Sequence, residues 1–85
     1  MLIHTEEISS LEGFRLNVSF NNGVSGQIDL SDEVWGEVFL PLKDAELFAT
    51  ARQDPMMRTV VWANGADLAP EFLLDLLIKQ TKATA

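Results

Sequence analysis

The segment 60–74 constrains the fold more than any other part of the chain. Residues 60–62 are valine, valine and tryptophan, and β-branched and aromatic residues favour a strand. Asn64-Gly65 follows, and this pair is typical of a tight turn. Pro70 then opens an apolar run, and proline is tolerated at the first position of a helix. We therefore expect a strand, a turn and a C-terminal helix in direct succession.

A second strong pattern covers residues 14–30, where apolar and polar residues alternate on both sides of positions 21–23. Period two on two adjacent segments predicts a half-buried β-hairpin. A three-residue loop over 21–23 keeps one face apolar, whereas a two-residue turn would set apolar residues opposite polar ones. Gly23 then takes the left-handed position that closes such a loop. In this register Arg15 lies opposite Asp29 on the outer face.

Shorter patterns predict the remaining elements. The turn at Asp54-Pro55 predicts a second hairpin, because proline presets the backbone for a turn. Asp44 predicts a helix start, because aspartate is a preferred N-cap residue. The remaining expected elements are a first strand within 2–8, a short helix from Ser31, an apolar connector over 38–42, a helix over 45–49, and hairpin strands over 50–53 and 58–62.

These elements predict an α+β fold. We expect an antiparallel sheet built from two β-hairpins plus an N-terminal strand, packed by a C-terminal α-helix and one or two short helices. A chain of 85 residues is the size of one domain, so residues 1–85 form a single domain. We expect its ordered core to span about 2–80 and the tail 81–85 to fray.

Charge and composition exclude several function classes. The net charge is −7, with 13 acidic and 6 basic residues, and the basic ones are scattered. Nucleic-acid binding draws much of its affinity from clustered Lys and Arg, so we expect no direct nucleic-acid partner. The same charge disfavours an anionic membrane surface, and no apolar run reaches the length of about 18 residues that a membrane span needs. The chain has no cysteine, which suits a cytoplasmic protein.

No catalytic constellation is recognisable. His4 is the only histidine, and no nucleophile motif accompanies it. Asp67 and Glu71 have the four-residue spacing that could bind a cation on a helix. The more ordinary interpretation is that Asp67 stabilises the turn before the helix and that Glu71 complements the helix dipole. We expect no enzyme activity, no cofactor and no metal site.

The final helix exceeds what a single core requires. Glu71 and Asp75 belong to one polar stripe, and the apolar arc around it covers roughly 240°, where a helix on one core needs little more than about 100°. Leu74 and Ile78 then point sideways, toward the connector around Phe39 or toward another chain. Exposed apolar patches often mark interfaces. Leu74, Ile78, Glu71, Asp75 and Phe39 are therefore interface candidates, and the alternative is that the connector covers them within one chain.

Three motifs in order resemble the family called domain of unknown function 2442. The resemblance covers roughly residues 8 to 78 and rests on Leu16-x-Val18-x-Phe20-Asn21-x-Gly23 with Val24-x-Gly26-x-Ile28-Asp29-Leu30, on Val38-Phe39-x-Pro41-Leu42-Lys43-Asp44, and on Val61-Trp62-x-Asn64-Gly65-x-Asp67-Leu68-Ala69-Pro70-Glu71. Members of this family are free-standing small bacterial proteins or precede a helix-turn-helix domain. Free-standing members are often encoded beside another small protein, in an arrangement like a toxin–antitoxin pair. The resemblance implies a binding role and offers no catalytic residues.

We therefore expect a non-catalytic protein-interaction module, the acidic, antitoxin-like member of a small two-protein bacterial system. Its partner would be a second copy of the chain or a small basic protein, because the exposed stripe on the last helix is acidic. The alternative is a small-molecule or metal-ion sensing domain that uses acids near the strand-turn-helix junction, where Asn64, Gly65, Asp67 and Pro70 lie.

Overall fold

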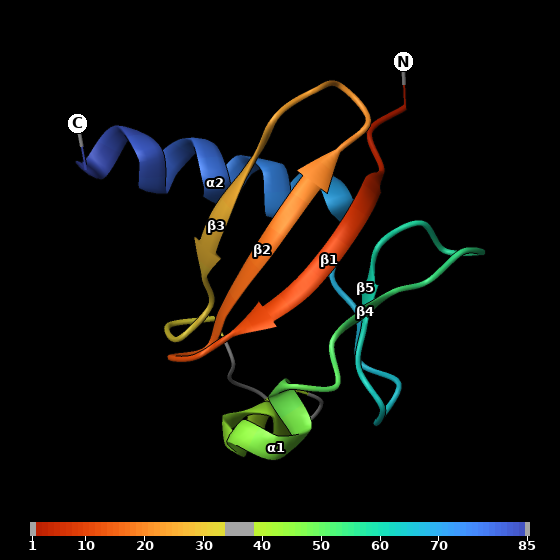
Figure 1. The fold of residues 1–85 in the computed structure, drawn as a ribbon. Coiled ribbons are helices and arrows are strands. Elements are labelled where there is room, and N and C mark those ends of the chain that lie inside the picture. The colour runs from red at the N-terminus through yellow and green to blue at the C-terminus, as the bar shows by residue number, and fades with distance from the viewer. Residues whose placement is uncertain (1, 34–38, 85) are drawn as a thin grey trace.

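The computed structural model describes residues 2–33 and 39–84. Strands β1 (Thr5–Leu11), β2 (Arg15–Phe20) and β3 (Ser25–Asp29) form an antiparallel sheet in that order, and β4 (Arg52–Gln53) pairs with β5 (Val60–Val61) in a smaller sheet. Helix α2 (Pro70–Thr84) crosses behind the larger sheet (Figure 1). The 3-10 helix η1 (Leu40–Lys43) and the short helix α1 (Ala45–Phe48) join the two halves. The expected α+β fold with a C-terminal helix is confirmed.

The register of the β2–β3 hairpin is the predicted one. Arg15 pairs with Asp29 and the other partners follow in step. Phe20 N–H donates to the Val24 carbonyl at 2.8 Å, which closes the loop over 21–23. Gly23 has φ 87°, in the left-handed region that glycine adopts at little cost.

The predicted first strand is also present. It begins at Thr5 and pairs antiparallel with β2, with an irregularity between Thr5 and Glu7. The connecting turn places Gly13 at φ 78° and Phe14 at φ 60°. A bulky residue in the left-handed region is unusual, because its Cβ crowds the backbone and this conformation costs roughly 1–2 kcal/mol.

Thr5 connects the two sheets. Its side chain is fully buried, and its hydroxyl donates to the side-chain carbonyl of Gln53 on β4. The Gln53 amide returns a hydrogen bond to the Thr5 carbonyl at 2.6 Å. Thr5 N–H donates to the Arg58 carbonyl at 3.0 Å, in the turn that leads to β5. The second hairpin is therefore held against the edge of the first sheet by a small buried polar network.

The second hairpin turns at the predicted Asp54-Pro55 pair. The Asp54 carboxylate accepts the N–H groups of Met56 and Met57 at 3.1 and 2.7 Å. These bonds hold the pKa of Asp54 below its usual value, the Met57 N–H having the largest effect. The hydrogen bonds satisfy turn amides that the short strands leave unpaired.

The junction after β5 has the predicted tight turn. Trp62 N–H donates to the Ala66 carbonyl at 2.9 Å, and the Asn64 side chain accepts the Ala66 N–H at 3.1 Å. Gly65 takes φ 87°. Helix α2 begins at Pro70 as predicted, and its backbone continues to residue 84, beyond the helix end expected near position 80.

Helix α2 packs on the sheet through Leu73 and Leu77, both of which are buried. Gly26 on β3 makes room for this contact, because a Cβ there would lie 2.9 Å from Leu77 Cδ1. Phe72 on the same helix is 38% exposed, so the sheet contact is made by the Leu73–Leu77 side of α2.

The Gln80 amide pairs with the edge of β3. Its Oε1 accepts the Asp29 N–H and its Nε2 donates to the Asp29 carbonyl, both at 2.8 Å. An edge strand leaves such groups unpaired along its outer side. The last full turns of α2 therefore cover one end of that edge.

The connecting segment also follows the sequence pattern where it is described. The Asp44 carboxylate caps α1 by accepting the Glu46 N–H at 2.9 Å. Leu42 is fully buried, so the apolar connector does close one end of the core. Residues 31–33 form a turn, and the rest of the short helix expected from Ser31 lies outside the described residues. The buried hydrophobic core comprises Leu16, Val18, Phe20, Ile28, Leu30, Leu42, Phe48, Val60, Trp62, Ala66, Leu73 and Leu77.

Candidate functional site

The interface candidates on α2 fall into two environments. Leu74 is half-buried and packs against the core, as does Phe39 from the connector. Ile78 is 45% exposed, and Glu71 and Asp75 are exposed beside it. The predicted polar stripe is present, and in it Asp75 forms an ion pair with Lys79, one helical turn later, at 2.9 Å. The apolar residues of the predicted patch are thus mostly used by the chain itself.

The strand-turn-helix junction is a structural element in this fold. Asn64 and Gly65 build the turn, and Asp67 forms an isolated bridge with Val61. Pro70 starts the helix directly after it. Within residues 2–33 and 39–84, no three or more His, Cys, Asp or Glu side chains gather in a way that could hold a metal ion.

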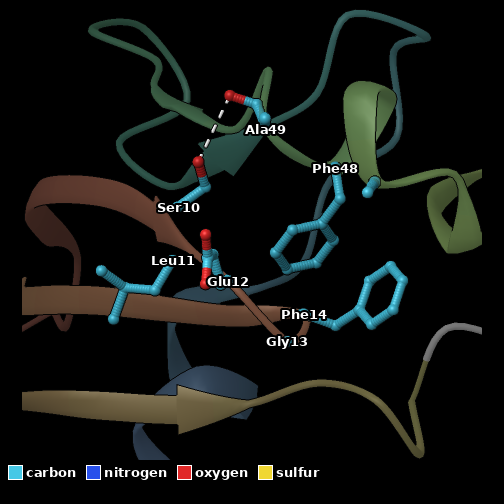
Figure 2. A pocket seen from close by; sticks show the side chains of 8 residues that line it. Ser10, Leu11, Glu12, Gly13, Phe14, Phe48 and Ala49 are labelled. Atoms are coloured by element: carbon cyan, nitrogen blue, oxygen red, sulfur yellow. Dashed lines mark hydrogen bonds between the residues drawn. The ribbon is translucent and has the colours of Figure 1, made fainter.

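A pocket of about 310 Å³ lies at the turn between β1 and β2, where it meets α1 (Figure 2). Its lining comes from two segments: the end of β1 with the β1–β2 turn, and helix α1 with the residue that follows it. The lining residues are Ser10, Leu11, Glu12, Gly13, Phe14, Ala45, Phe48 and Ala49. A volume just above 300 Å³ is at the small end of ligand pockets, for which roughly 300–1,000 Å³ is usual.

Two aromatic rings shape this pocket. The Phe14 and Phe48 rings meet edge to face, with centroids 5.4 Å apart and planes at 80°. The Phe48 ring also contacts Trp62, whose indole N–H donates to the Phe48 carbonyl at 3.1 Å. The Ser10 hydroxyl donates to the Ala49 carbonyl at 3.3 Å and ties the two walls together (Figure 2). Because the walls are joined in this way, the pocket belongs to the folded framework.

Sequence reasoning does not identify this pocket. Its walls are about 30 residues apart in the chain, and neither Glu12 nor Ala49 belongs to a recognisable motif. Phe14 follows Gly13 in the turn and has φ 60°, a region where glycine or asparagine is ordinarily preferred. This backbone conformation cannot be read from the sequence alone.

The second candidate surface is the outer face of the three-stranded sheet, opposite α2 (Figure 1). Strand alternation and the register place hydroxyl and amide side chains on it, and a hollow of about 280 Å³ lies across the strands. The outward residues are Glu7, Ser9 and Leu11 of β1, Arg15, Asn17 and Ser19 of β2, and Ser25, Gln27 and Asp29 of β3. Most of this face is uncharged and polar, which distinguishes it from the acidic chain as a whole.

The charged groups of this face are held in place locally. Arg15 donates from Nε to the Glu12 carbonyl at 2.9 Å and from Nη1 to the Gln27 side chain at 3.1 Å. Hydrogen bonds from Ser31, followed by the nearby Arg15 charge, hold the pKa of Asp29 below its usual value despite slight burial. Asp29 therefore stays charged at neutral pH, and the Arg15 side chain is oriented by hydrogen bonds to neutral groups.

None of the helices formed by the described residues has the length and apolar character needed to cross a membrane.

The comparisons with known proteins give one structural likeness. No protein-family model and no curated protein matches this chain. A crystal structure of a proposed DNA-binding protein from Nitrosomonas europaea matches with a TM-score of 0.83 and 17% sequence identity. The match covers 96% of this chain and 53% of that one. It shows a shared fold, and this chain spans about half the length of that protein.

This likeness contradicts the expected function and partners. A protein-interaction module with an antitoxin-like role, a self or small basic partner and no nucleic-acid contact does not fit a fold found in a proposed DNA-binding protein. The sensing alternative finds no metal-holding cluster among the described residues, and the Asn64 side chain at the junction is used in the turn itself. The electrostatic expectation does not fit this likeness, and net charge averages over the whole surface, so it does not describe any single face. The outer sheet face holds Glu7 and Asp29, and the exposed Glu6 lies at the irregularity in β1 beside it.

Proposed function

We propose that the chain is a DNA-binding domain whose outer sheet face is the surface that meets the duplex. The observation that carries this proposal is the fold shared over 96% of the chain with a proposed DNA-binding protein. The match covers 53% of that protein. Assigning its DNA binding to the half that this chain resembles is therefore part of the proposal.

The chemistry of the outer face supports a DNA contact. Hydroxyl and amide side chains such as Asn17, Ser19 and Gln27 donate to phosphate oxygens, and amides also pair with base edges. β-Sheets and β-ribbons are established readers of DNA grooves. Arg15 supplies a cation on this face, beside the acids Glu7 and Asp29. The uncharged hydrogen-bonding side chains between them are the groups that would contact the duplex.

The charges of the chain determine the expected affinity for DNA and its salt dependence. One basic side chain on the face neutralises at most one phosphate, so log K should fall with log salt at a slope near about −0.9. The net charge of −7 opposes association. We therefore expect a dissociation constant near the weak end of non-specific binding, roughly 10⁻⁴ M.

Fluorescence anisotropy of a labelled duplex of about 20 base pairs tests the proposal. We expect saturable binding in about 50 mM salt. Arg15→Gln should reduce the salt slope by about 1, whereas the matched Lys43→Gln, an exposed cation on η1, should leave the slope unchanged. Absence of saturable binding up to about 1 mM chain would overturn the proposal, since it exceeds the weakest non-specific affinity of roughly 10⁻⁴ M by tenfold.

Three further proposals rest on the sequence. The motifs around Gly23, Asp44 and Asn64 support membership of the domain of unknown function 2442 family. The lack of a nucleophile paired with His4 supports a binding role without a reaction of its own. The lack of cysteine supports a cytoplasmic location.

A further inference from the structure

We propose that the pocket at the β1–β2 turn binds a small organic cation, an ammonium group attached to an aromatic ring or short alkyl chain. This site is separate from the outer sheet face and from the strand-turn-helix junction. The pocket faces α1 at the end of the hairpin, and no DNA contact is needed for it to be occupied.

The size and surface of the pocket set the apolar part of the ligand. A volume of about 310 Å³ admits one ring with a short chain. The walls are carbon-rich: the Phe14 and Phe48 rings and the methyl groups of Ala45 and Ala49. Edge-to-face rings present both π-surface and ring edge to whatever enters, so a flat aromatic or a compact alkyl group fits best.

The charge at the pocket sets the polar part of the ligand. Glu12 is the only ionisable residue in the lining and is exposed at the mouth (Figure 2). Arg15, the nearest described cation on this turn, is turned back to the Glu12 carbonyl and the Gln27 side chain. A carboxylate beside aromatic faces is the combination that attracts ammonium ions, through ion pairing and cation–π contact. An anionic ligand would meet repulsion from Glu12.

The backbone supports a use for the Phe14 ring beyond closing the turn. Phe14 stays at φ 60°, in the left-handed region that most side chains avoid. Its carbonyl accepts the Leu30 N–H at 2.9 Å, so the residue is held from the far side by the sheet. Strain of this kind persists where the surrounding structure fixes it, and it gathers at binding sites.

Two-dimensional NMR of the labelled chain with 2-phenylethylammonium as the probe tests the inference. We expect saturable shifts at Glu12, Gly13, Ala45 and Ala49 with a dissociation constant of roughly 1 mM, as small ligands of this size reach. The neutral analogue 2-phenylethanol should bind about two- to fivefold more weakly, the usual range for one exposed charge pair. The anion 3-phenylpropionate should bind more weakly still.

Two variants separate the apolar and charged contributions. Ala45→Leu fills the pocket from an exposed position and should weaken binding at least about tenfold, because the leucine side chain occupies the space of the probe's phenyl ring. Ala63→Leu, an exposed alanine outside the pocket, is the matched control. Glu12→Gln should make the cation and the neutral analogue bind alike. If Ala45→Leu unfolds the chain, Ala49→Leu on the same wall replaces it.

The inference is overturned if the probe gives no saturable shift, if the shifts survive both filling variants, or if the anion binds as tightly as the cation. Binding of the cation and the neutral analogue with equal affinity would overturn the role of Glu12 and with it the ligand class. These results are independent of the DNA titration, so either proposal can fail alone.

Discussion

The Thr5–Gln53 network should contribute measurably to stability, because it joins the two sheets at a site where water has little access. Thr5→Val keeps the shape of the side chain but removes the hydroxyl that donates to Gln53. Thr5 is fully buried and Gln53 is half-buried. Loss of one hydrogen bond with a partly buried acceptor left unpaired costs about 1–2 kcal/mol.

The effect is large for a domain of this size. One kcal/mol shifts the Tm of an 85-residue domain by about 4–8 °C, so Thr5→Val should lower the Tm by about 5–15 °C. Urea denaturation followed by circular dichroism measures the same loss as a lower midpoint at an unchanged slope. Ser9→Ala, an exposed hydroxyl on the same strand, should stay within about 0.5 kcal/mol.

A double-mutant cycle shows whether the loss comes from this contact. Gln53→Ala should destabilise the chain alone, and adding it to Thr5→Val should cost less than the sum by about 0.5–1.5 kcal/mol. If the two changes are additive, or if Thr5→Val has no effect, the network does not join the sheets as described.

Two further predictions follow from the packing and the charges. Gly26→Val should destabilise the chain by about 1–3 kcal/mol in urea denaturation, because its Cβ would crowd Leu77; an unchanged midpoint would show that α2 does not pack there. Since the folded pKa of Asp29 lies below its ordinary value, its stabilising contribution is present above the ordinary pKa and is lost as pH falls through the folded pKa. In Asp29→Asn, the free energy of unfolding should therefore fall less steeply with decreasing pH below about pH 4 than it does in the wild-type chain.

Local patterns predicted most of the fold. Alternation around 21–23 and the left-handed preference of Gly23 determined the β2–β3 register, because both act within a few residues. The Asp44 cap and the start of α2 at Pro70 were predicted for the same reason. The close approach of Leu77 to Gly26 could not be predicted, since it depends on where α2 lies on the folded sheet.

The candidate sites were predicted less well. Four of the five interface candidates lie on α2 and Phe39 lies on the connector; Leu74 and Phe39 pack against the core, and Ile78 is 45% exposed. The pocket depends on contacts between Phe14 and Phe48, which are far apart in the chain. Net charge predicted no nucleic-acid partner, which does not fit the fold shared with a proposed DNA-binding protein; net charge carries no information on which face the acids occupy.

The central claim is that DNA meets the outer face of the β1–β2–β3 sheet. The most direct measurement is an NMR titration of the labelled chain with unlabelled duplex in about 50 mM salt, low enough to retain weak non-specific binding. We predict shifts concentrated at Asn17, Ser19, Ser25 and Gln27, with Ile78 and the other residues of α2 unmoved. Shifts confined to α2, or none anywhere on the sheet, would contradict the claim.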